Sequence, residues 1–442
     1  MPAPIAVRPL EEWVDPSALF PGVPDDHAFW LDAGPDAADG WSWVGAGVPA
    51  ERPDPVVDGT AQRVHDAGAA SGPFLGGWIG WCDYDSAAAA AGAPHRRDDA
   101  VPASMWLRVD RVVAFDHAAR TAWLVAPADE LEAFADTVAS WRQAAAGRVA
   151  VAGSPLRGAA AARVQPDAYA ALVERCRAAI RRGDAYQLCL TTRFDVTAQG
   201  AIDPLETFLR LRETASSHHG GLIRSGAAAI VSASPERFLQ LDGGAIRTSP
   251  IKGTRRRDGE DAADRALAQE LVTSPKERAE NVMIVDLMRN DLQRVCVPGS
   301  VVVERLLEVE TYPTVHQLVS TVAGTLRRGI RFSDVLAATF PAGSMTGAPK
   351  LSAMTILHEL EGGPRGVFAG CFGWIGDDGR GDLAMVIRSI LVAGDRAYVG
   401  AGGGITWGSE PEAEVDEVAL KARAPLAALG ADLPPRWRER VR

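Results

Sequence analysis

The chain has 442 residues, 47% of them hydrophobic, and a formal net charge of −11 at pH 7. This composition permits a large apolar core, and the negative charge argues against nucleic acid or an anionic membrane as a partner. The five cysteines contain no CxxC pair, which argues against a disulfide framework or a zinc site. The sequence shows no signal peptide and no apolar stretch long enough to span a membrane, so we expect a cytoplasmic protein.

The first part of the chain, residues 1–146, contains short apolar runs separated by Gly- and Pro-rich turns. Such runs are typical of strands. We interpret Ala87–Arg97 as a loop and the Ala/Gly/Arg-rich segment 147–166 as a linker. The predicted organisation is an N-terminal region at 1–146, this linker, and a catalytic region at 167–430. The expected strands of the first region are Ala28–Leu31, Gly76–Trp81, Met105–Val109, Val112–Phe115 and Ala122–Val125.

The second region mixes helices and strands without strict alternation, which predicts an α+β fold. Apolar residues at helical spacing from Tyr169 to Ile180 predict a helix that Gly183 ends. Ser274 and Pro275 indicate the cap and first turn of another helix. The other expected helices are 204–214, 262–273, 275–295, 346–361 (a loop leading into a helix) and 411–429, and the expected strands are 186–194, 221–224, 228–233, 238–241, 245–248, 366–375, 383–392 and 397–401.

Two pairs of glutamates have a spacing that places both carboxylates of a pair on one helix face. Glu277 and Glu280 are three residues apart on one predicted helix, and Glu414 and Glu417 are three apart on the last helix. If the pairs converge, they form an all-oxygen site that suits Mg²⁺ together with substrate and water. Solvated helix surface is the alternative for each pair.

The chain contains 46 basic residues, but only four of them are lysines. Arginine keeps its proton in proteins, whereas lysine can become a neutral amine. Lys252 follows a predicted strand and precedes a glycine. It is either an exposed turn residue or, beside a metal and arginines, a nucleophile with a lowered pKa. Glu236, at the end of another predicted strand, is the matching candidate for a general acid.

Two glycine clusters are candidate anion-binding segments. Gly402, Gly403 and Gly404 follow a strand, and the loop Gly343–Lys350, which contains Thr346, opens a helix. Glycines let backbone N–H groups approach an anion, and a helix N-terminus favours negative charge. Neither cluster matches a nucleotide-binding loop. A carboxylate-binding loop and ordinary turns both remain open.

Two further charged or titratable residues occur in apolar surroundings. Arg388 lies within a predicted apolar strand, where an unpaired charge is costly, so we expect it to pair with a carboxylate. His316, within YPTVHQLVS, is either a structural histidine or a substrate contact.

These segments, taken in order, resemble the chorismate-utilising family. It includes component I of anthranilate and aminodeoxychorismate synthases and, further off, isochorismate and salicylate synthases. The resemblance covers about residues 165–425, and FLGGWIGWCDYD (74–85) extends it more loosely into the N-terminal region. It implies a large composite β-sandwich with helices on the outside. The matching stretches include GDAYQLCLTTRF (183–194), SASPERF (232–238), TSPIKGTRRR (248–257), ERAENVMIVDLMRNDL (277–292), VHQLVSTVAG (315–324), FPAGSMTGAPK (340–350), GAGGGI (400–405) and EPEAEVDEVALKA (410–422).

The resemblance also implies a role for each matching residue. Glu280 and Glu417 correspond to ligands of Mg²⁺, with Glu277 and Glu414 as direct or water-mediated partners. The Mg²⁺ in turn holds the ring carboxylate of chorismate. The implied substrate-binding residues are His316, Thr346, Arg388, Tyr398, Gly402, Gly403, Gly404 and Lys421.

Two positions separate the branches of the family. Isochorismate and salicylate synthases resemble each other in having a water-activating lysine where this chain has Gln187. Anthranilate synthases typically have PIAGT where this chain has Lys252 in PIKGT. Lys252 therefore implies the aminodeoxychorismate branch, in which chorismate is aminated at C4 on the way to 4-aminobenzoate and folate. In the implied mechanism Lys252 attacks C2, Glu236 protonates the departing hydroxyl, and ammonia expels Lys252.

The ammonia is expected to come from a separate glutamine amidotransferase subunit. Ala369–Gly373 is a near match to a glutaminase nucleophile segment, but it has alanine in the first place and no HxE follows it. We therefore expect Cys371 to be packed in a strand. The alternatives are an anthranilate synthase component I, an aminodeoxychorismate synthase of secondary metabolism, and a non-catalytic binding subunit.

Overall fold

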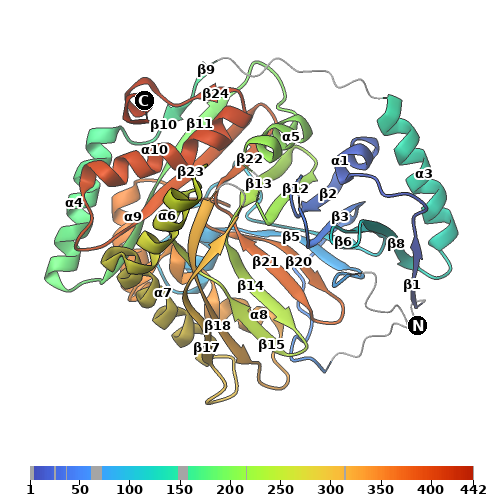
Figure 1. Cartoon of the computed structure of the whole chain (residues 1–442), viewed down its shortest axis with the longest axis horizontal. Coiled ribbons are helices and arrows are strands. Elements are labelled where there is room, and N and C mark those ends of the chain that lie inside the picture. Colours follow the sequence, from blue (N-terminus) through green and yellow to red (C-terminus); the bar gives the residue numbers. More distant parts are fainter. Residues whose placement is uncertain are drawn as a thin grey trace.

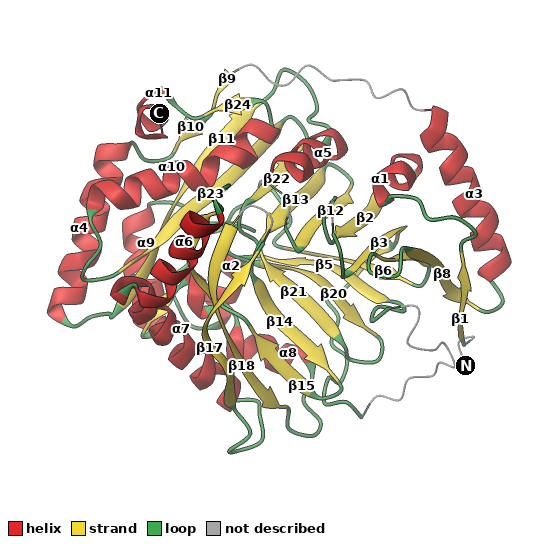
Figure 2. Cartoon of the chain, in the orientation of Figure 1, coloured by secondary structure: helices red, strands yellow, loops and turns green. Residues whose placement is uncertain are grey.

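A computed structural model describes residues 4–23, 26–35, 37–60, 72–147, 158–215, 217–312 and 315–441. Two large antiparallel sheets form the body of the molecule, and most helices lie around them (Figures 1 and 2). One apolar core contains buried residues from both sheets, such as Phe29 and Trp43 of the larger and Trp81 and Phe372 of the smaller. The predicted α+β sandwich with external helices is therefore confirmed.

The larger sheet joins strands from both ends of the sequence. Its N-terminal half meets the rest where Leu31 pairs with Gly221. In spatial order its strands are β1 (Ile5–Pro9), β8 (Thr121–Pro127), β7 (Val112–Asp116), β3 (Trp41–Ala46), β2 (His27–Asp32), β12 (His219–Ser225), β13 (Ala228–Ser234), β22 (Ser389–Ala393), β23 (Arg396–Ile405), β11 (Gln187–Thr197) and β10 (Ala161–Ala162), with β19 (Gly347–Ala348) beside β11.

The smaller sheet is also built from both regions. Its N-terminal strands join the others where Cys82 pairs with Cys371. In spatial order its strands are β16 (Ile251–Arg256), β18 (Val315–Thr325), β15 (Ala245–Thr248), β14 (Arg237–Asp242), β21 (Gly381–Met385), β20 (Cys371–Gly376), β5 (Gly77–Cys82), β6 (Ser104–Val109) and β4 (Val48–Ala50), with β17 (Val302–Thr311) beside β18. A short parallel pair, β9 (Gly158–Ala159) and β24 (Ala431–Asp432), lies apart from both sheets.

A second apolar core lies between the larger sheet and the helices that cover it. Val173 of α4 (Pro166–Arg182), Phe208 of α5 (Pro204–Thr214) and Val418 of α10 (Pro411–Ala428) are fully buried there. Helix α7 (Pro275–Gln293) packs instead on β18 of the smaller sheet. The remaining helices are α1 (Pro16–Leu19), α2 (Tyr84–Ala90), α3 (Leu131–Gly147), α6 (Asp261–Thr273), α8 (Phe332–Thr339), α9 (Lys350–Glu361) and α11 (Pro435–Arg438).

Most expected elements are present, and the differences have local causes. The predicted loop at 87–97 is wrong at its start, because α2 continues to Ala90 from a cap in which Asp83 accepts the Ser86 N–H. The strand predicted at 383–392 is two strands, β21 and β22, with Arg388 between them at φ 51°. The part of the predicted linker at 148–157 lies outside the described residues.

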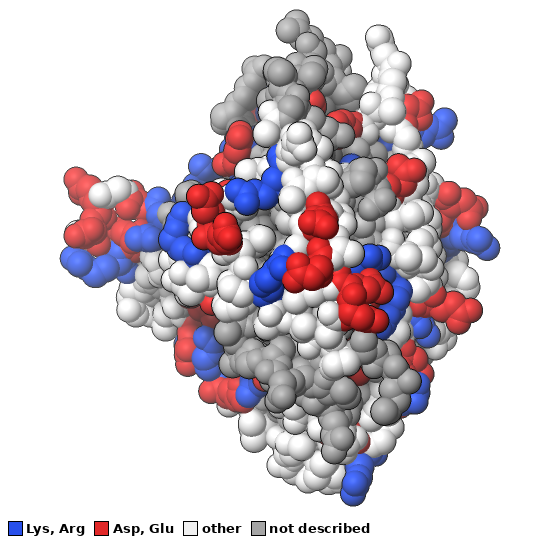
Figure 3. Space-filling model, turned by 90° about the vertical axis from the view of Figure 1, so that its right-hand side faces the viewer, with Lys and Arg blue, Asp and Glu red and all other residues white. Residues whose placement is uncertain are grey.

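The charged residues are dispersed over the face that Figure 3 displays. Acidic and basic side chains alternate there, without one large area of a single sign. No helix of the described residues is both long and apolar enough to cross a membrane.

Candidate active site

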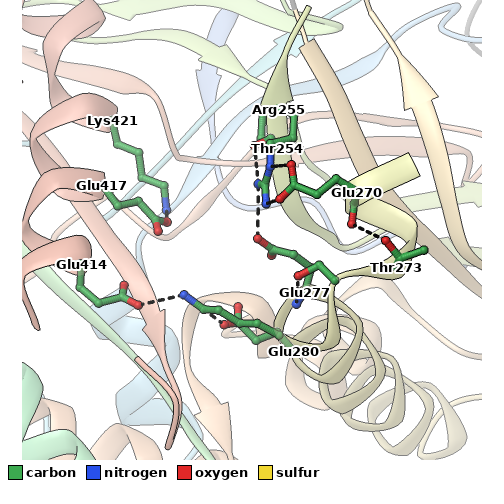
Figure 4. Close-up of polar contacts among 11 residues, drawn as sticks. Thr254, Arg255, Glu270, Thr273, Glu277, Glu280, Glu414, Glu417 and Lys421 are labelled. Atoms are coloured by element: carbon green, nitrogen blue, oxygen red, sulfur yellow. Dashed lines mark hydrogen bonds and ion pairs between the residues drawn. The ribbon is translucent and has the colours of Figure 1, made fainter. Parts of the chain in front are cut away.

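The two glutamate pairs lie on helices that face each other. Glu277 and Glu280 project from the first turns of α7, and Glu414 and Glu417 project from the first turns of α10 (Figure 4). Helix α7 begins where the sequence predicted, because the Ser274 hydroxyl accepts the Glu277 N–H at 3.4 Å and a proline follows. The capped start of α7 therefore directs one carboxylate pair towards the other.

A β-bulge presents Lys252 to the same region. Ile251 pairs with Val319 and Thr254 with Gln317, so β16 has one residue more than β18 between these two pairs. An extra residue of this kind redirects the neighbouring side chains. Gly253 takes φ 85°, and a Cβ there would lie 3.0 Å from Glu277 Oε2. The lysine thus lies in a strand, not in the turn that the sequence suggested as one alternative.

The glycines of β23 allow polar side chains of the site to approach the strand closely on both of its faces. A Cβ at Gly403 would lie 2.7 Å from Glu414 Oε2, and a Cβ at Gly404 would lie 2.5 Å from Gln187 Nε2 and 3.6 Å from Lys252 Nζ. Successive residues of a strand point to opposite faces. Any side chain at either position would displace a polar group of the site, which explains the need for glycine here.

Burial and neighbouring charges set different pKa values for the glutamates. Burial raises the pKa of Glu280 to about 7, although Lys252 and Lys276 oppose this. Burial and the nearby Glu417 also raise the pKa of Glu414. Lys421 has the opposite effect on Glu417, whose pKa lies below the usual value. Burial and the neighbouring lysines thus have opposite effects on the pKa values of these carboxylates.

Basic side chains balance these carboxylates. Arg255 Nη1 lies 3.5 Å from Glu277 Oε1. Lys421 Nζ lies 2.5 Å from Glu417 Oε1 and donates to the Gly402 carbonyl at 2.8 Å. Lys276 Nζ lies 3.4 Å from Glu414 Oε1 and 3.9 Å from Glu280 Oε1.

The carboxylates fit a hard divalent cation such as Mg²⁺. Glu280 Oε1 is buried and forms no hydrogen bond. Among the described residues no three acidic, histidine or cysteine side chains converge into a preformed cage. Mg²⁺ in enzymes usually takes one or two carboxylates and completes its shell with substrate oxygens and water, so a pair of glutamates suffices.

Glu236 and Lys252 form the second part of the site. Glu236 lies between β13 and β14 and is buried, with its main-chain oxygen accepting the Met385 N–H at 3.0 Å. Burial raises the pKa of its carboxyl, and the positive charge of Lys252 opposes that effect. Glu236 and Lys252 therefore act on each other electrostatically within the same buried region.

Three of the predicted substrate-binding residues have structural partners. His316, on β18, uses both ring nitrogens, with Asp264 Oδ1 and Thr311 Oγ1 each at 2.9 Å. The Tyr398 hydroxyl accepts the Val367 N–H at 3.0 Å, and its ring lies 3.6 Å from the Arg193 guanidinium carbon. The Thr346 hydroxyl donates to the Ala342 carbonyl at 3.1 Å, and its own carbonyl accepts the Cys189 N–H.

Arg388 is close to the site but lacks the direct ion pair that the sequence predicted. Burial lowers its pKa, and Glu417 is the carboxylate that opposes this. No described carboxylate forms a salt bridge with it, so the interaction acts through space. Arg388 takes a left-handed backbone conformation in the short segment between the end of β21 and the start of β22.

Two neighbours of the site were not predicted as site residues. Gln187 is fully buried, and neither amide atom forms a hydrogen bond. The sequence singled it out only as a difference between branches. Lys276 was noticed only as one of four lysines, because its contact with α10 depends on how distant helices pack.

Comparison with known proteins identifies relatives of this chain. The family model described as chorismate binding enzyme matches residues 48–427. An aminodeoxychorismate synthase of Streptomyces pristinaespiralis is 37% identical over 96% of this chain, and this chain spans only 62% of its length. An anthranilate synthase component 1 of Streptomyces coelicolor is 37% identical over 95% of this chain and 87% of its own. The crystal structure of anthranilate synthase component I from Streptococcus pneumoniae superposes with a TM-score of 0.72 at 28% identity, covering 96% of this chain and 92% of that one.

Proposed function

Because the chain belongs to the family of chorismate binding enzymes, we propose that it is the chorismate-converting component of an aminodeoxychorismate synthase. It would replace the C4 hydroxyl of chorismate by an amino group. The observation that carries this proposal is the β-bulge at Lys252, whose charge acts on the pKa of Glu236 and Glu280 and whose Nζ would lie 3.6 Å from a Cβ at Gly404. The similarity to an aminodeoxychorismate synthase from Streptomyces supports it.

Glu280 and Glu417 are the residues that would hold Mg²⁺, with Glu277 and Glu414 as direct or water-mediated partners. When bound, Mg²⁺ supplies positive charge for the ring carboxylate of chorismate and for the charge that develops next to it. Lys421 holds Glu417 in position and is itself held by the Gly402 carbonyl.

In the first chemical step the Lys252 amine attacks C2 of the ring. The C2–N bond forms, both ring double bonds shift, and the bond from C4 to the hydroxyl oxygen breaks. Glu236 donates its proton to that oxygen, which leaves as water. Burial favours this role, because it raises the pKa of Glu236.

In the second step ammonia attacks C4 and reverses these shifts. The C4–N bond forms, the double bonds return, and the C2–N bond to Lys252 breaks. The Glu236 carboxylate accepts a proton from the added nitrogen. Because two allylic displacements occur in sequence, the amino group takes the face that the hydroxyl left.

A glutamine amidotransferase partner would supply the ammonia. The described part of the chain offers no glutaminase nucleophile, because Cys371 is fully buried within β20. The burial of Cys371 agrees with the expectation that this cysteine is packed in a strand. The enzyme alone should therefore use ammonium salts.

A product assay tests the proposed reaction. The purified protein is mixed with chorismate, Mg²⁺ and ammonium at alkaline pH, with and without an aminodeoxychorismate lyase. We expect 4-aminobenzoate only when the lyase is present. Anthranilate formed without the lyase would assign the chain to the anthranilate branch and remove the proposed role of Lys252.

A further inference from the structure

Lys276 lies between the two carboxylate pairs and contacts both of them. Its Nζ is 3.4 Å from Glu414 Oε1 on α10 and 3.9 Å from Glu280 Oε1 one turn further along α7. Glu414 and Glu280 have almost no exposed side-chain surface, at 2% and 10%. The ammonium group therefore sits at the point where one cation can neutralise a carboxylate of each pair.

The other basic residues of the site are anchored differently. Arg255 also forms a salt bridge with Glu270, at 2.9 Å, and approaches only Glu277. Lys421 is held by the Gly402 carbonyl and approaches only Glu417. The Lys276 ammonium has no such anchor among the described residues, and its side chain is 44% exposed, so it has an open path to solvent.

We propose that Lys276 is the resident counter-ion of the metal-free site and competes with Mg²⁺ for Glu280 and Glu414. Its ammonium stands where a divalent cation shared by these two carboxylates would have to approach. Metal entry then requires the lysine to swing outwards. This inference deepens the proposed function and rests on its Mg²⁺ site.

The charges around the site explain why such competition would be useful. With Lys276, Lys421, Arg255 and Arg388 beside the glutamates, Mg²⁺ alone adds two positive charges to a region that already holds several basic side chains. Chorismate carries two carboxylates, so Mg²⁺ entering together with chorismate leaves the charge balance unchanged. Lys276 would thus make tight metal binding depend on the dianionic substrate.

Metal titration of the full-length protein without substrate tests the proposal. Mn²⁺ serves as the probe, because free Mn²⁺ is counted directly by electron paramagnetic resonance. The Lys276→Met variant should bind Mn²⁺ about tenfold more tightly than the unsubstituted protein, since the competing charge is removed. The Lys276→Arg variant, which keeps the charge, should not gain affinity.

Arg278→Met is the matched control for net charge. Arg278 is an exposed cation two residues further along α7, where it donates to the Val272 carbonyl. Its loss should change Mn²⁺ affinity by less than about twofold, because an exposed charge is screened. Thermal unfolding without metal verifies that each variant is folded.

The substrate dependence provides a second readout. Chorismate added without ammonia should tighten Mn²⁺ binding more in the unsubstituted protein than in Lys276→Met. Equal or weaker Mn²⁺ binding by a folded Lys276→Met variant would overturn the proposal. That failure would be distinct from a failure of the proposed reaction, which the product assay detects independently of metal affinity.

Discussion

Strand β11 contacts two sets of buried polar groups, one with hydrogen-bond partners and one without. Near Cys189 and Thr191, Arg365 donates to both oxygens of Glu361 and to two main-chain carbonyls, and Glu361 accepts two further hydrogen bonds from Thr191. Two residues earlier on the same strand, Gln187 is equally buried, yet its amide has no hydrogen-bond partner.

The difference indicates which polar groups serve the fold and which serve a ligand. A buried polar group without a partner costs free energy, so a stable protein keeps it only where something else repays that cost. The Glu361–Arg365 cluster is complete and forms a rigid wall. The Gln187 amide and Glu280 Oε1 both lack hydrogen-bond partners, and we infer that substrate and metal supply them.

Replacing Lys252, which lies on the side of the unpartnered groups, should have the largest effect on activity. In Lys252→Ala we expect amination of chorismate to fall by about a thousandfold or more, since the covalent route is lost. Lys252→Arg is the matched control, because it retains the positive charge but cannot attack. Both rates are measured in the ammonium-dependent product assay. Full activity in either variant would mean that Lys252 acts only through its charge or not at all.

Replacing Glu236 should have the second largest effect on activity. We expect Glu236→Gln to lower kcat by about 10²–10⁴-fold, the usual loss for a general acid. Burial raises the pKa of Glu236, so the normal enzyme should lose activity as pH increases through that raised value. The variant should lack this alkaline decrease in kcat/KM. An unchanged pH profile would assign the proton transfer to another group.

Substitutions in the Glu361–Arg365 cluster should lower the stability of the fold. Arg365→Met leaves Glu361 buried without its partner, and we expect a loss of about 3–5 kcal/mol in the free energy of unfolding. Chemical denaturation measures this loss. The double variant Glu361→Leu/Arg365→Met removes both charges and should recover much of the stability. A loss below about 1 kcal/mol in the single variant would contradict the structural role of this pair.

Replacing Gln187 should give the opposite result, with stability retained and activity reduced. Gln187→Met keeps the side-chain volume and removes two unpartnered polar atoms, so stability should stay the same or rise by about 1 kcal/mol. Activity should nevertheless fall, by about tenfold, because the substrate complex loses a polar contact. Thermal unfolding and the product assay measure the two effects. Lower stability with normal activity would make Gln187 a structural residue.

The paired glutamates show how far sequence reasoning reaches. Their spacing of three residues places Glu277 beside Glu280 and Glu414 beside Glu417 on any helix, and Ser274 and Pro275 correctly indicated where α7 begins. The spacing and the cap depend on neighbours in the sequence, which is why they could be predicted. Whether the two pairs converge was left open, because it depends on how α7 and α10 pack.

Features that depend on distant packing were missed or left open. The sequence could not show that Asp264 from α6 occupies one ring nitrogen of His316, or that Lys276 reaches α10. The β-bulge at Lys252 depends on the register of β16 against β18, which no local pattern encodes. Strand β17 was not predicted, because its charged and mostly exposed residues do not alternate as a half-buried strand should.

The most direct measurement is intact-protein mass spectrometry of the enzyme after reaction with chorismate and Mg²⁺ without ammonia, followed by peptide mapping. The covalent mechanism predicts a mass increase of chorismate less one water, located on Lys252 and released when ammonium is added. Lys252→Arg should show no increase. Complete amination with no adduct on Lys252 at any time would contradict the mechanism.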